Sequence, residues 1–250
     1  MNLIKLSLND VYIIKSDLKK MIKLCSWNIQ AGGGSRVLSI VKSIAKSKSN
    51  ILPLSEFRNN DSGNTIRNYL LKSGYRYQAV THSGRNENSV LIASSLPFNS
   101  EIYPTCDPKF SGNIISAHFS AFSVLGVYLP HKKKHQLLEF ITKEVSENDI
   151  PFIISGDYNT GVNYVDQKGN SFWYTDQLEK LKKVGFKDAF RLVNGEAEEY
   201  SWFSHQGNGF RYDHTFVDNN LAPIITDCYY DNQWRIHKLS DHSPMFLEMG

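Results

Sequence analysis

Carboxylate, amide and imidazole side chains stand in five short segments spread along the sequence. Together they could hydrolyse a phosphate ester. The segments are SWNI (26–29), SEFR (55–58), GDYN (156–159), FRYDH (210–214) and SDH (240–242). Four of the five follow or interrupt a short apolar run, which predicts a polar side chain at the end of a strand. Oxygen donors aimed into one cleft from such strand ends can hold a hard divalent cation and activate water.

Apolar patterning predicts that strands and helices alternate and carry these segments. Apolar spacing and the glycines at 74 and 185 predict where the helices lie and end. Strands alternate with helices in both halves of the chain, which favours helix-covered sheets in an α/β sandwich over an all-β barrel. The predicted strands are 22–29, 50–57, 75–80, 88–94, 113–120, 121–129, 151–159, 200–204, 210–218, 222–230 and 243–249, and the predicted helices are 35–48, 64–74, 134–147 and 175–185.

Composition predicts one catalytic domain over residues 21–250, preceded by an extension (1–20) of unclear role. The chain has 250 residues, 41% of them hydrophobic, and no Pro/Gly/Ser-rich linker divides it. Its formal charge of +3 is compatible with an anionic substrate without requiring one. The three cysteines match no zinc or disulfide pattern, which indicates reduced thiols in a cytoplasmic protein. Charges interrupt the first twenty residues, and no apolar run is long enough to insert into a membrane.

In this order, the five segments resemble the endonuclease/exonuclease/phosphatase superfamily, which includes exonuclease III, abasic-site endonucleases and deoxyribonuclease I. The resemblance covers about residues 21–248. It implies an α/β fold, a four-layer sandwich with two mixed β-sheets face to face and helices outside. It also implies a phosphodiesterase that depends on Mg²⁺ or Mn²⁺.

The resemblance assigns the metal and the attacking water to two groups of residues. Glu56 and Asp241 are expected as metal ligands, and Asn28 as a ligand that also ties the metal to the catalytic carboxylates. Asp157 is expected to orient or deprotonate the water, and Asn159 to donate to phosphate oxygens. Residues two apart in an extended chain point the same way, so both side chains of GDYN can reach one cleft.

The remaining assignments concern charge on the phosphate and contact with substrate. Asp213 and His242 are expected to pair, so that the carboxylate fixes the imidazole tautomer and favours its protonated form. Tyr128 is expected to bond the phosphate. For several substrate-binding candidates a purely structural role stays open as the alternative. These candidates are Trp202, Arg211, Arg58, Asn163, Lys132 and Lys133.

The function expected from this pattern is a Mg²⁺-dependent nuclease, with DNA as substrate and a monomeric state. RNA or a phosphorylated small molecule such as an inositol phosphate, phospholipid or nucleotide is the first alternative. A catalytically inactive scaffold is the second, although all the acidic and histidine positions are present. Only eight residues (203–210) separate Trp202 from Arg211, and the segment after GDYN departs from the abasic-endonuclease pattern. These departures weigh against abasic-site recognition rather than against phosphodiester chemistry.

Overall fold

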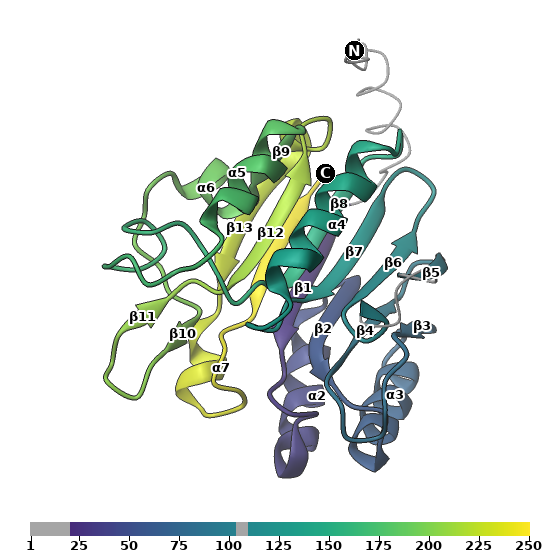
Figure 1. Ribbon diagram of the computed structural model, residues 1–250. Coiled ribbons are helices and arrows are strands. Elements are labelled where there is room, and N and C mark those ends of the chain that lie inside the picture. Colours follow the sequence, from purple (N-terminus) through teal and green to yellow (C-terminus); the bar gives the residue numbers. More distant parts are fainter. Residues whose placement is uncertain (1–20, 104–109) are drawn as a thin grey trace.

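The computed structural model describes residues 21–103 and 110–250, which form two β-sheets packed face to face (Figure 1). The predicted extension (1–20) lies outside the described residues. The first sheet has the order β13 (Ile225–Tyr230), β14 (Met245–Met249), β1 (Ile22–Asn28), β2 (Ile51–Phe57), β4 (Ser89–Ser94) and β3 (Tyr77–Val80). The second has the order β5 (Asn99–Tyr103), β6 (Ile114–His118), β7 (Ser123–Tyr128), β8 (Phe152–Asp157), β12 (Asp213–Asp218) and β9 (Phe186–Asp188).

Both sheets are mixed, and helices cover their outer faces (Figure 1). β1 runs parallel to β2, and β7 parallel to β8, whereas the other pairs are antiparallel. A short hairpin of β10 (Trp202–Phe203) and β11 (Gly209–Phe210) stands apart from the sheets. The helices are α2 (Val37–Ser47), α3 (Asp61–Lys72), α4 (Lys134–Ser146), α5 (Thr175–Lys183), α6 (Ala189–Asn194) and α7 (Asn232–Ile236), with single 3-10 turns at Gly34–Arg36 and Ala222–Ile224. The predicted four-layer α/β sandwich is confirmed.

Three apolar clusters fill the spaces between these layers. One lies between the sheets and joins residues such as Leu24, Ile92 and Ile153. A second packs α4 and α5 on the second sheet, and a third packs α2 and α3 on the first. Strand residues alternate between the inner and outer clusters, as the period of two in a β-strand requires. Both faces of each sheet are therefore covered, which holds the strand ends rigidly.

Several predicted boundaries are wrong for local reasons. The predicted strand 210–218 is two strands, β11 and β12, interrupted at 211–212. Residues 222–224 form a 3-10 turn containing Pro223, so β13 begins only at Ile225. Helix α5 spans Thr175–Lys183, two residues shorter than the predicted 175–185, and its cap residue Tyr174 makes no side-chain hydrogen bond to it. The short elements β9, α6 and α7 have too few residues to show a periodic pattern.

No helix among the described residues has the length and apolar character needed to cross a bilayer.

Candidate active site

Asn28 ends β1 and Glu56 stands one residue before the end of the parallel strand β2, so their side chains meet at one edge of the first sheet. Glu56 sits in a β-bulge between Ser55 and Phe57 and has a left-handed φ of 53°. Bulges re-aim a side chain, and such strained backbone is concentrated at functional sites. The bulge turns Glu56 so that its Oε2 accepts a hydrogen bond from the Ala31 backbone at 2.7 Å.

The Asn28 amide bridges carboxylates from both sheets. Its Nδ2 donates to Glu56 Oε1 at 3.2 Å and to Asp157 Oδ2 at 2.9 Å, while its Oδ1 accepts from the Gln30 backbone at 2.9 Å. The side chain is 1% exposed. An amide NH₂ group cannot ligate a cation, so this arrangement favours the bridging role expected of Asn28 over direct metal ligation.

Asp157 ends β8 in the middle of the second sheet, and close packing of the backbone fixes its position. A Cβ on Gly156 would lie 1.9 Å from the Val127 carbonyl oxygen, so only glycine fits before this aspartate. Asp157 Oδ1 accepts from the Asn159 backbone at 2.9 Å, and Oδ2 accepts from Asn159 Nδ2 at 3.0 Å. This Asx-turn holds Asn159 in a left-handed conformation (φ 49°). The two GDYN side chains therefore meet through this turn and not through the expected extended chain, because β8 ends at Asp157.

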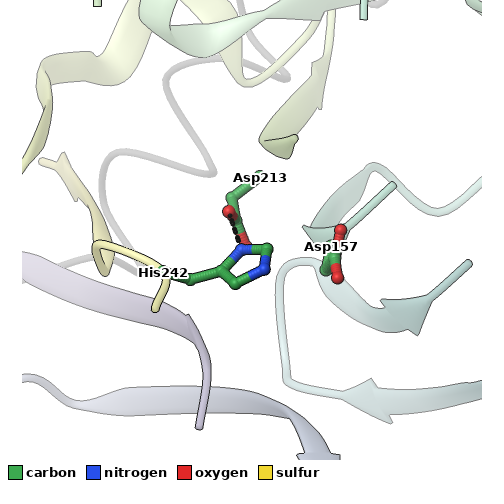
Figure 2. A group of neighbouring side chains, drawn as sticks. All are labelled: Asp157, Asp213 and His242. Carbon is green, nitrogen blue, oxygen red and sulfur yellow. Dashed lines mark hydrogen bonds and ion pairs between the residues drawn. The ribbon is translucent and has the colours of Figure 1, made fainter. Parts of the chain in front are cut away.

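His242 lies between the carboxylates of Asp213 and Asp157 (Figure 2). Its Nδ1 bonds to Asp213 Oδ2 at 2.7 Å, which leaves the second ring nitrogen on the side of Asp157. Burial alone would lower the pKa of His242, but the charge and hydrogen bond of Asp213, helped by Asp157 and Asp241, raise the pKa to about 10. The imidazole is thus held as a cation at neutral pH.

The pKa of the Asp157 carboxylate is raised to a value that suits a general base. Burial raises its pKa to about 7, with Asp213 adding to the rise, whereas His242 and the hydrogen bonds from Asn159 and Asn28 oppose it. A general base works best when its pKa lies near the working pH. The surroundings of Asp157 thus bring its pKa into the range that suits a general base.

Tyr128 ends β7 and reaches the same network from the other side. Its hydroxyl donates to Glu56 Oε1 at 3.3 Å and accepts from Asn88 Nδ2 at 3.3 Å. Asn88 in turn accepts from Arg58 Nε at 2.9 Å. Burial, with the nearby charge of Glu56, raises the pKa of Tyr128 above its ordinary value, so the hydroxyl keeps its proton. Asn88 carries no sequence signal, because it stands at the first position of the predicted strand 88–94 outside any of the five motifs.

Asp241 is exposed and is held by its neighbours rather than by the central carboxylates. Its Oδ2 accepts from Trp202 Nε1 at 3.2 Å, and its Oδ1 lies 3.4 Å from the Ser240 hydroxyl. Ser240 also donates to the Asn28 carbonyl oxygen at 2.6 Å, and Trp27 Nε1 donates to the His242 carbonyl oxygen at 2.9 Å. These bonds fasten the SDH segment to the end of β1, and a metal-binding role for Asp241 stays a prediction.

Arg211 is enclosed within the fold, which favours the structural alternative over the expected contact with substrate. The side chain is 0% exposed and pairs with Asp166 at 2.8 Å and with Asp188. Burial alone would lower its pKa, but the two carboxylates raise the pKa well above its ordinary value, and the pKa of Asp188 is lowered in return despite burial. Arg211 thus has the alternative role considered for it, bracing the strand.

Asn163 also works within the fold. Its Oδ1 accepts from the Phe172 backbone at 3.0 Å and from Gln167 at 2.7 Å, and its Nδ2 donates to the Phe172 carbonyl at 3.3 Å. Every polar atom of this amide is engaged inside the 163–172 loop. The structure gives Asn163 the structural role of closing that loop, and its expected contact with substrate is not supported.

The three lysines that follow Tyr128 lie in different surroundings. Lys132 lines a cavity beside Asn159, and Lys133 lines another beside Tyr128. Lys134 was not predicted as a site residue, yet it is 4% exposed and its Nζ donates to the Asn159 carbonyl oxygen at 2.6 Å. Burial lowers the pKa of Lys134, with Asp157 opposing that effect. The cluster of lysines was a usable signal, but spacing alone does not tell which lysine turns inward.

The chemistry of the donor set fits a hard divalent cation. Glu56 and Asp157 offer carboxylate oxygens, which Mg²⁺ prefers, and no cysteine lies among the network residues. Asp213 Oδ1 is a buried oxygen without a hydrogen-bond partner. Donor atoms of Asp157, Asp213 and His242 lie within 4.8 Å of one another. Because His242 and Asp213 already bond to each other, Glu56 remains the predicted principal ligand of the metal.

Comparison with known proteins agrees with this geometry. A sequence model of the Endonuclease/Exonuclease/phosphatase family matches residues 25–242. None of the curated proteins matches the chain. Among solved structures, an AP endonuclease from Archaeoglobus fulgidus superposes with a TM-score of 0.80 at 20% identity, covering 91% of this chain and 99% of that one.

Two further structures come from Neisseria. A 3′ phosphatase, NExo, bound to product DNA hairpin has a TM-score of 0.78 at 21% identity, with 92% of this chain and 99% of that chain covered. A 3′-5′ exonuclease (NExo) from Neisseria meningitidis has a TM-score of 0.75 at 22% identity, with 91% and 99% covered. Identities this low show a shared fold, and the family match extends over all five motifs. The chain therefore belongs to the Endonuclease/Exonuclease/phosphatase family and is a phosphoric ester hydrolase.

Proposed function

We propose that the protein is a Mg²⁺-dependent nuclease that cleaves phosphodiester bonds in DNA. The observation that carries the proposal is the single hydrogen-bonded network of Asn28, Glu56, Asp157, Asn159 and Tyr128, with the Asp213–His242 pair beside it. Each part of this network matches a need of phosphodiester hydrolysis, namely a base, a cation, oxygen-binding donors and a place for a hard metal.

In the proposed reaction Asp157 orients a water molecule and takes its proton. The water oxygen bonds to phosphorus as the ester P–O bond opposite it breaks, and the leaving oxygen gains a proton from solvent. Asn159 Nδ2, the Tyr128 hydroxyl and the His242 cation donate to the non-bridging oxygens, on which charge accumulates. A Mg²⁺ ion bound at Glu56, with Asp241 as its second predicted ligand, would supply positive charge next to the phosphate.

Two cavities favour a polymeric substrate over a small phosphoester. One of about 500 Å³ is lined by Arg58, Lys133 and the network residue Tyr128. The other, of about 420 Å³, is lined by Lys132, Lys134 and the network residue Asn159. A strand with a phosphate at the network could extend into both cavities, where cationic side chains meet its neighbouring phosphates.

Subcellular location and oligomeric state stay predictions. The described cysteines, Cys25 and Cys228, are both buried and free, as expected of a protein in the reducing cytoplasm. We propose a cytoplasmic monomer on this ground and on the completeness of the network within one chain.

A panel of substrates tests the proposed function. Plasmid DNA, abasic duplex DNA, single-stranded RNA, a nucleotide and a phosphoinositide are each incubated with Mg²⁺ and again with EDTA. We expect DNA cleavage that EDTA abolishes and that the Asp157→Asn variant lacks. Hydrolysis of the phosphoinositide or the nucleotide alone would transfer the proposal to small phosphoesters. Absence of turnover on every substrate would favour the inactive scaffold.

A further inference from the structure

The cavity beside Asn159 combines aromatic and cationic side chains in a way that hydrolysis alone does not require. Its volume is about 420 Å³, within the range of about 300–1,000 Å³ that small-molecule sites occupy. It opens next to the residue that we propose to hold the phosphate. Its lining consists of His131, Lys132, Lys134, Asn159, Ser171, Phe172, Trp173, Tyr174 and Tyr212.

The aromatic part of this cavity includes an unusually exposed tryptophan. Trp173 is 71% exposed and Tyr174 is 39% exposed, although residues of this size normally bury most of their surface. Tyr174 stacks on His135 with ring centroids 4.6 Å apart and planes at 11°. The Tyr212 ring centroid lies 5.7 Å from that of Phe172 and 6.4 Å from that of His242. Tyr212 also stacks on Phe210 with ring centroids 5.4 Å apart, so the exposed ring of Trp173 is the one that offers a flat face to a ligand in this cavity.

Buried ion pairs hold the loop that carries these rings. Asp166 accepts from the Val162 backbone at 2.8 Å and from the side chains of Arg211 at 2.8 Å and Arg191 at 2.7 Å. Thr160 donates to the Trp173 carbonyl oxygen at 2.8 Å. The cavity wall is therefore fixed before any ligand binds, so little ordering of the chain would oppose binding.

The cationic part of the cavity lies toward the catalytic network. The Lys134 ammonium is 2.6 Å from the Asn159 carbonyl oxygen and 3.5 Å from His131 Nδ1. Lys132 adds a second positive charge to the lining. A ligand with an aromatic ring at one end and a phosphate at the other matches this polarity.

We propose that this cavity, bounded by Lys132, Trp173 and Tyr212, is a subsite for one unpaired base of the substrate strand, next to the scissile phosphate. The proposal rests on the proposed nuclease function and deepens it, because it makes the substrate single-stranded or frayed at the cut. A base inside a duplex has both faces covered by its neighbours, whereas an unpaired base can leave the stack and lie on protein rings. Stacking on aromatic side chains tolerates any base, so the subsite would select strand state rather than sequence.

Fluorescent oligonucleotides test the subsite directly. The unpaired base analogue 2-aminopurine loses fluorescence when it stacks, so single-stranded oligonucleotides with this base at successive positions are titrated with the full chain in EDTA. Trp173→Ala is compared with Tyr164→Ala, since both rings are 71% exposed in the same loop but Tyr164 does not line the cavity. Trp173→Ala should bind about 5- to 150-fold more weakly, the range expected for loss of one stacked base, and Tyr164→Ala should bind like the wild type.

The outcomes separate the subsite from the nuclease function. Tighter binding of single strands than of the matched duplex, with quenching at one position that Trp173→Ala removes, would support the subsite even if no strand were cut with Mg²⁺. Cutting of DNA together with equal affinities of Trp173→Ala and the wild type would overturn the subsite and leave the nuclease function standing. Equal affinities for duplex and single strand would also overturn it.

Discussion

The Asp213–His242 pair allows a quantitative prediction. Asn replaces the carboxylate of Asp213 without changing its size, which removes the charge 2.7 Å from His242 Nδ1. Burial then dominates, and the pKa of His242 should fall from about 10 toward or below its ordinary 6.5. A fall of about 3.5 units corresponds to at most about 5 kcal/mol of lost preference for the imidazolium.

The consequence for activity depends on pH. With a pKa near 6.5, roughly 3% of the imidazole is protonated at pH 8 and about half at pH 6.5. If the cation stabilises the phosphate, the activity of Asp213→Asn relative to the wild type should drop about 15-fold or more between these two pH values. The imidazole of the variant loses its proton as pH rises through about 6.5, whereas the wild-type imidazole keeps its proton up to about pH 10. The activity deficit of the variant must therefore grow as pH rises.

Two measurements check this prediction. The ratio of kcat/KM for Asp213→Asn and wild type is followed from pH 6 to 9 on a DNA substrate, and the His242 pKa is determined by NMR on metal-free protein. Asp218→Asn serves as the matched control, because Asp218 lies at the other end of β12 and its carboxylate bonds to the neighbouring Asn220 instead of to His242. A constant ratio across this range, or a His242 pKa that stays near 10 in the variant, would show that Asp213 does not hold the proton on His242.

Three other substitutions test separate parts of the structure. Asp157→Asn should lower kcat by about 10³-fold or more, because an amide cannot take the proton of the attacking water; a loss of a hundred-fold or less in a steady-state assay contradicts its role. The NH₂ group of the variant cannot accept the bonds that one carboxylate oxygen of Asp157 accepts, so a melting curve must show that the variant is folded. Arg211→Met should lower the free energy of unfolding by about 3–5 kcal/mol at pH 7, because it leaves Asp166 and Asp188 buried without their main partner. Since the pKa of Asp188 is lowered in the fold, this stabilisation is lost as pH falls below about 4, and urea titrations at pH 7 and pH 3.5 should show the deficit narrowing. Gly156→Ala should yield little folded protein by circular dichroism, because its Cβ would lie 1.9 Å from a backbone oxygen, whereas Gly169→Ala, which meets nothing within 4 Å, should fold normally.

Much of the fold and the centre of the site could be predicted from the sequence. Strongly periodic segments such as α2 and α4 could be recognised because each buries a continuous apolar stripe. The five motifs identified Asn28, Glu56 and Asp157 as candidate site residues, because the order of the motifs along the chain is a pattern that chance rarely produces. The Asp213–His242 contact confirms the predicted pairing.

What the sequence did not reveal depends on three-dimensional packing. Nothing local distinguishes Lys134, which turns inward to Asn159, from Lys132 and Lys133 beside it. Arg211 stands one residue before the cleft residue Tyr212, yet it points into the interior, where Asp166 and Asp188 converge from distant segments. The bulge at Glu56 likewise depends on how β2 pairs with β4. Such features follow from the neighbours that a residue meets, which spacing does not specify.

The Asn28 amide joins a strand of one sheet to the aspartate at the end of a strand of the other. The reacting groups are therefore divided between the two β-sheets and lie close together only when the sheets pack on each other. A partly unfolded chain could keep each sheet intact and still have no working centre. Enzyme turnover thus depends on the packing between the two sheets. Mild denaturant should abolish turnover at a lower concentration than the one that unfolds the strands.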